Sequence, residues 1–86
     1  MSQREIAALE SEINCLNRER EVLANEWERK RSNLVDQVRR SSSTQTTVDL
    51  VNQISQLSNE YTSKKNTLEM KLCETRQIYF RKLQGL

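Results

Sequence analysis

The apolar positions of this chain are arranged almost symmetrically about Thr44. Residues at equal distances on its two sides pair one large apolar or aromatic side chain with another. In an antiparallel helical hairpin, such residues lie at the same level along the two helices. The pattern therefore predicts an all-α antiparallel hairpin, a coiled coil, whose seam contains Leu9 with Tyr79, Leu16 with Leu72, Trp27 with Tyr61, and Leu34 with Ile54.

Each half of the chain carries the periodicity of an amphipathic helix. In the first half, apolar residues recur at alternating steps of three and four, with polar interruptions at Arg20 and Lys30. In the second half the same spacing slips by one residue between Leu68 and Leu72. Steps of three and four are typical of a coiled-coil seam, and a slip of this kind locally unwinds the supercoil.

The expected ends of the two helices carry capping residues. Ser2 with Glu5 matches the capping-box spacing at the first start, and Thr46 with Asp49 matches it more weakly at the second. Gly85, the only glycine, is a candidate C-cap. These residues indicate two helices rather than one.

Seven small polar residues, 41–47, separate the two periodic segments and are expected to form the turn. We therefore expect helix over about 2–40 and about 47–85, in one domain spanning 1–86. The alternative is one continuous helix, because Ser and Thr cost only about half a kcal/mol each in a helix. The symmetry about Thr44 favours the hairpin.

The composition suits long, solvated helices better than a globule. Charged residues make up 30% of the 86 residues, hydrophobic residues make up 35%, and proline is absent. A hairpin of two helices has a single seam and buries little apolar surface. We therefore expect the hairpin to assemble with further helices into a bundle, as a homo-oligomer or with a partner protein.

Additional apolar residues lie beside the predicted seam, mostly toward the open end of the hairpin. We expect them to widen the apolar face enough to receive further helices. The predicted partner interface consists of Cys15, Val22, Met70, Cys73, Ile78 and Phe80.

The chain offers little for chemistry other than binding. It has no histidine, and two cysteines with scattered carboxylates do not make a zinc site. We expect no catalytic residues, no cofactor and no metal. The basic run Arg29–Arg31 is diluted by Glu26 and Glu28 and interrupted by Trp27, which disfavours a DNA-reading basic helix.

These observations predict a non-enzymatic coiled-coil interaction or scaffold subunit that binds partner helices, or itself, through the open end. One alternative is a helical chaperone or adaptor that sequesters an amphipathic client segment. Another is a basic coiled coil that binds nucleic acid. Ser42 follows Arg39 and Arg40 and is a candidate phosphorylation site.

No apolar run approaches the length of a membrane span, and the first residues lack the apolar core of a secretory signal. We therefore expect no membrane partner and an intracellular location, in the cytoplasm or nucleus. In that setting Cys15 and Cys73 are expected to be free thiols rather than a disulfide.

Overall fold

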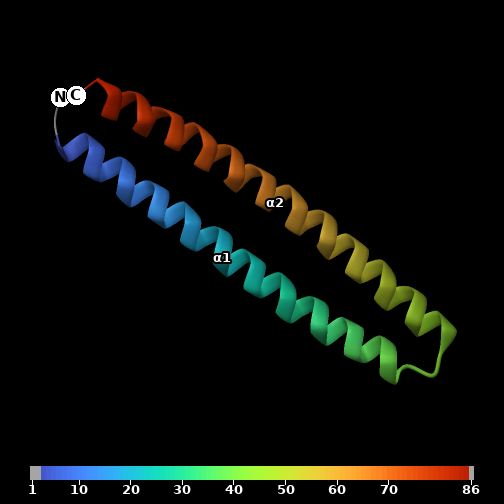
Figure 1. Cartoon of the computed structure of the whole chain (residues 1–86). Helices are drawn as coiled ribbons and strands as arrows, with labels where there is room; N and C mark the ends of the chain where they lie inside the picture. The colour runs from blue at the N-terminus through green and yellow to red at the C-terminus, as the bar shows by residue number, and fades with distance from the viewer. Residues whose placement is uncertain (1–2, 86) are drawn as a thin grey trace.

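The computed structural model describes residues 3–85, and it is a hairpin of two long antiparallel helices (Figure 1). Helix α1 spans Gln3–Arg40 and α2 spans Thr44–Gln84. The molecule measures 64 × 15 × 12 Å, and residues 3–85 contain no strand. The start of α1 and the end of α2 lie at the same end of the molecule, called the open end below (Figure 1). The predicted all-α hairpin is confirmed, and the continuous helix is wrong.

The connection between the helices comprises only residues 41–43, so the prediction of a non-helical segment over 41–47 is wrong. Ser43 is the N-cap of α2: its backbone is extended (φ −102°, ψ 129°), and its Oγ accepts a hydrogen bond from the Thr46 N–H at 3.4 Å. Thr47 Oγ1 donates to the Ser43 carbonyl at 3.0 Å. The capping serine supplies an acceptor for one of the first-turn N–H groups that lack a partner within the helix, so α2 can begin directly after Ser43.

The capping box expected at Thr46 and Asp49 does not form, because both residues already lie inside α2. The Asp49 carboxylate instead accepts a hydrogen bond from Gln45 Nε2 at 3.1 Å. Of the first predicted capping box, Ser2 lies outside the described residues. At the other end of α2, Gly85 is the C-cap, with a right-handed backbone (φ −74°, ψ −8°) and its N–H donating to the Arg81 carbonyl at 3.1 Å.

The register predicted from the symmetry is confirmed by the ring contact at mid-length. Trp27 and Tyr61, equidistant from Thr44, stack with centroids 5.5 Å apart and planes 12° from parallel. Counted from the helix ends that meet at the connection, Tyr61 lies about four residues deeper in α2 than Trp27 lies in α1. This difference corresponds to an offset of about 6 Å along the helices. The first turn of α2 therefore projects beyond the end of α1, which is why the centre of symmetry lies inside a helix.

The core is a narrow row of side chains between the helices. Among residues 3–85 the buried ones are Leu16, Leu50, Leu72 and Thr75, and Leu72 is only 2% exposed. Thr75 tolerates burial because its Oγ1 donates to the Lys71 carbonyl at 2.7 Å. Every predicted seam residue is buried or half-buried: Leu9, Leu16, Trp27, Leu34, Ile54, Tyr61, Leu72 and Tyr79.

The phase slip in α2 lies earlier than predicted. Lys65 is half-buried, four residues after Tyr61 and three before Leu68. The two successive four-residue steps therefore run from residue 57 through Tyr61 to Lys65, and the row then continues regularly past Leu72. A lysine can occupy such a position because its methylene stem covers apolar surface while its ammonium group stays in water.

Candidate interaction surfaces

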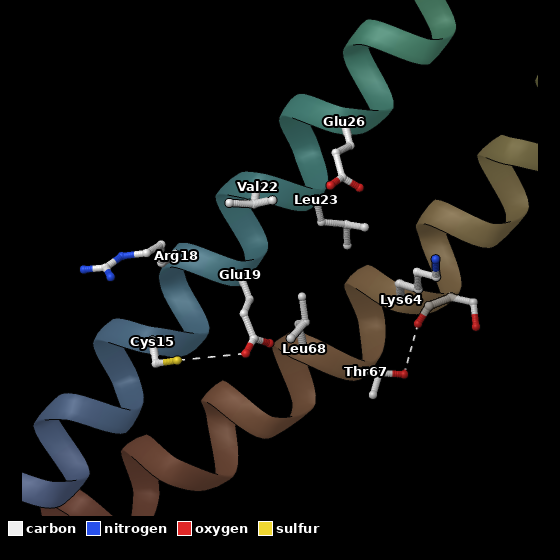
Figure 2. A pocket seen from close by; sticks show the side chains of 10 residues that line it. Cys15, Arg18, Glu19, Val22, Leu23, Glu26, Lys64, Thr67 and Leu68 are labelled. Atoms are coloured by element: carbon white, nitrogen blue, oxygen red, sulfur yellow. Dashed lines mark hydrogen bonds between the residues drawn. The ribbon is translucent and has the colours of Figure 1, made fainter.

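A groove runs along one face of the hairpin, between the middle of α1 and the middle of α2 (Figure 2). It encloses about 580 Å³. Leu23 and Leu68 point toward the space between the helices (Figure 2). Cys15 and Val22 line it from α1, and Thr67 lines it from α2. We call the side of the hairpin that carries this groove the groove face.

The groove face continues toward the open end in a second hollow. Its lining includes Leu9 and Cys15 of α1 and Lys71, Thr75 and Ile78 of α2. Since Cys15 lines both hollows, the two form one continuous furrow beside the seam. Its exposed apolar side chains, Val22 and Ile78, lie at opposite ends of that furrow.

Cys73 and Phe80 lie on the other side of the hairpin, the back face. They line a separate hollow together with Arg20 and Leu72. Successive helical residues are rotated by about 100°, so Lys71 and Cys73 lie on opposite sides of the inward-pointing Leu72. Lys71 lines the groove face, and Cys73 therefore belongs to the back face.

The six predicted partner residues are all exposed, but the structure does not bring them together on one face. Cys15, Val22 and Ile78 lie on the groove face. Met70, which is 64% exposed, precedes the inward Leu72 by two residues and so points away from α1. Cys73 and Phe80 lie on the back face.

The two cysteines are free, as the sequence led us to expect. Cys15 and Cys73 are level along the hairpin but line opposite faces, so they cannot approach within the few ångströms that a disulfide requires. Cys15 Sγ donates to Glu19 Oε1 at 3.9 Å, and Cys73 Sγ accepts from Gln77 Nε2 at 3.8 Å.

The groove face also carries an ordered arrangement of charge that our sequence analysis missed. On α1, Glu12, Glu19 and Glu26 recur every seven residues along the furrow. On α2, Lys64 and Lys71 are also seven residues apart. The seven-residue interval was the signal that could have revealed this arrangement. Across residues 3–85, no ion pair joins the glutamates to these lysines.

Two polar contacts join the helices at the open end. Lys82 Nζ lies 2.8 Å from Glu5 Oε2, and the Lys82 ammonium lowers the pKa of the Glu5 carboxyl. The Tyr79 hydroxyl donates to Glu10 Oε1 at 2.8 Å, which raises the pKa of Tyr79 because ionisation would break the bond. Both contacts have the register predicted from the symmetry.

Ser42 is exposed in the connection between the helices, where a kinase could reach it. Its role as a phosphorylation site stays a prediction. Within residues 3–85 no three potential ligands from His, Cys, Asp or Glu come together to hold a metal ion. Neither helix, over its described length, is apolar enough to cross a membrane.

Comparison with known proteins finds no match. No protein-family model, curated protein or solved structure matches this chain. The proposals below therefore depend on the position, exposure and charge of its own side chains.

Proposed function

We propose that this hairpin is a non-enzymatic interaction module, or scaffold subunit, that binds further helices along its open-end half. The observation that carries the proposal is the pairing of a thin core with exposed apolar side chains. The binding helices belong either to a second copy or to a partner protein.

The core supplies little stabilisation for a chain of this length. Only three apolar residues, Leu16, Leu50 and Leu72, are buried among residues 3–85. Each residue ordered on folding costs about 1.5 kcal/mol of conformational entropy, and small domains rarely bury enough apolar surface to offset this cost. Packing against further helices would bury additional surface and stabilise the hairpin.

The exposed apolar side chains are concentrated away from the turn. We define the open half as residues 3–23 and 65–85, and the turn half as residues 24–64. The large apolar residues exposed in the open half are Val22, Met70, Ile78, Phe80 and Leu83, whereas those exposed in the turn half are Val48 and Val51. The open half is therefore the part with most apolar surface left to cover.

The first test is whether helix stability depends on association. We expect the melting temperature, followed by circular dichroism, to rise over about a hundredfold increase in chain concentration, because association stabilises the folded state by mass action. Sedimentation equilibrium should show an oligomer over the same range. A monomer that is fully helical and melts at a concentration-independent temperature would contradict the proposal.

The second test locates the surface. One double variant, Val22→Glu with Ile78→Glu, places charge on the groove face, and another, Cys73→Glu with Phe80→Glu, places it on the back face. Burying an unpaired carboxylate costs several kcal/mol, so the variant that alters the interface should dissociate. A lower molecular mass of the assembly in either variant, measured by sedimentation equilibrium, supports the proposal. An unchanged molecular mass in both variants contradicts it.

The matched control carries the same charges in the turn half. Asn59 and Thr62 are exposed, and both belong to α2. Replacing them with glutamate adds two carboxylates far from the open end, so the mass should not change.

A further inference from the structure

We infer that the groove face is closed by the groove face of a second copy of this chain, with α1 of each copy lying antiparallel over α2 of the other in a four-helix bundle. This inference rests on the proposed function and names its partner. The observation behind it is that the furrow carries mostly acidic side chains on α1 and mostly basic side chains on α2, with Arg18 and Glu74 as the exceptions.

The furrow has the composition of an unfinished helix-packing layer. Leu23 and Leu68 lie between the helices, and Val22 and Ile78, 50% and 42% exposed, flank the furrow. Cys15 and Val22 lie seven residues apart beside the glutamates of α1, with Arg18 between them. A second hairpin laid on this face would cover these apolar side chains.

The charges choose between the two ways in which a symmetric pair can stack. If the two-fold axis is parallel to the helices, α1 of one copy faces α2 of the other, so Glu19 and Glu26 face Lys71 and Lys64, whereas Glu12 lies near the level of Glu74. If the axis is perpendicular to the helices, α1 faces α1, glutamates face glutamates and lysines face lysines. Flanking charges of this kind determine partner orientation in helical assemblies. Charge complementarity therefore selects the parallel axis.

The register agrees with this choice. Rotation about an axis parallel to the helices leaves every residue at its own level, so the two open ends coincide. Glu19 of one copy then lies within two residues of the level of Lys71 of the other, and Glu26 within two residues of Lys64. Two residues correspond to about 3 Å along a helix, which is within the reach of these long side chains. Each pair occurs twice in the isologous interface.

The test uses charge reversal in two separate chains. The acid-reversed variant carries Glu19→Lys and Glu26→Lys, and the base-reversed variant carries Lys64→Glu and Lys71→Glu. Alone, each places like charges across the interface, and we expect its dimer to weaken about tenfold or more, because four attractive contacts become repulsive. Mixed in equal amounts, the two variants should form heterodimers, because one chain then carries lysine at all four positions and the other carries glutamate at all four. One chain is uniformly labelled with nitrogen-15, because Glu and Lys residues have nearly the same mass, and native mass spectrometry then separates the homodimers from the heterodimer.

Two further variants control for folding and for total charge. The quadruple variant with all four reversals restores complementarity within and between chains, so it should be helical and dimerise as the wild type does. Glu21→Lys with Glu28→Lys makes the same charge change on α1 outside the column of the groove face. This variant should dimerise as the wild type does.

Each remaining outcome overturns the inference in a distinguishable way. A mixture that stays monomeric, or a helical quadruple variant that does not dimerise, excludes the proposed pairing. Heterodimers of the acid-reversed chain with the wild type that are tighter than the wild-type dimer would place α1 over α1. A wild-type oligomer unaffected by both reversals but dissociated by Cys73→Glu with Phe80→Glu would leave the proposed function standing with a different surface. A concentration-independent monomer would remove both.

Discussion

The open half of the hairpin holds its helices together by side-chain contacts, whereas the turn half also has the covalent connection. Among residues 3–85, three of the four buried side chains, Leu16, Leu72 and Thr75, belong to the open half. The turn half buries Leu50 and contains the Trp27 and Tyr61 stack, in which Trp27 is only half-buried.

The polar contacts show the same contrast. Lys82 with Glu5 and Tyr79 with Glu10 join residues 77 and 69 positions apart, and both contacts lie at the open end. Chain ends fray unless they are held by tertiary contacts, and the entropy cost of closing a loop grows only slowly with its length. Distant contacts can therefore hold the open end together.

The open half nevertheless exposes more of the large apolar side chains than the turn half does. It is thus the better packed half and also the half with more apolar surface left uncovered. Packing between two helices uses only one side of each, so the adjoining sides stay available for other helices.

The largest effect is expected at the most deeply buried residue of the open half. Leu72→Ala should lower the free energy of unfolding by about 2–5 kcal/mol, because it removes buried methyl groups and leaves a cavity. Urea denaturation followed by circular dichroism measures the change. Met70→Ala, in the same helix but 64% exposed, is the matched control and should cost far less. Equal losses would mean that the seam is wrongly placed.

The next effect concerns the ring stack in the turn half. Trp27→Ala should cost about 2 kcal/mol, less than the 3–5 kcal/mol of a fully buried tryptophan, because Trp27 is half-buried. A double-mutant cycle with Tyr61→Leu should show a coupling of about 0.5–1.5 kcal/mol. No coupling between the two positions would contradict the observed stack.

A smaller effect is expected at the connection. Ser43→Ala removes the side-chain acceptor for the Thr46 N–H and should cost about 1 kcal/mol. Ser42→Ala, one residue earlier and exposed, is the matched control and should be nearly silent. If both substitutions were silent, the first turn of α2 would not depend on its cap.

The smallest effect is the pH dependence of the open end. Because the pKa of Glu5 is lowered in the folded state, its contribution to stability is present above the ordinary pKa of a glutamate and is lost as the pH falls through the lowered value. Glu5→Gln should remove this part of the acid dependence. Added salt should weaken it in the wild type, since the pair is exposed.

Tyr79 should show the opposite dependence. Its folded-state pKa is raised, so its contribution is complete below the ordinary pKa of a tyrosine and is lost as the pH rises through the raised value. Tyr79→Phe should flatten the alkaline part of the stability profile. An alkaline part that is the same in Tyr79→Phe and in the wild type would contradict the bond to Glu10.

The two helices, their antiparallel pairing and their register were predictable from the pattern of apolar residues alone. Periodicity places the apolar residues on one side of each helix, and burying both rows against each other leaves one main solution. Both helices rise by the same distance per residue, so residues equally far from Thr44 in the sequence lie at the same level. The symmetry therefore places Trp27 opposite Tyr61 and Leu16 opposite Leu72.

The length of the connection, and the side of the hairpin on which each flanking residue lies, became clear only from the folded hairpin. The residues over 44–47 are only about half a kcal/mol or less per residue worse than alanine in a helix, and the Ser43 cap favours a helix that begins directly after it. Equal level does not mean equal side: in an antiparallel pair, residues that precede the seam in both helices share a face. Cys15 precedes Leu16, whereas Cys73 follows Leu72, and the two cysteines therefore lie on opposite faces.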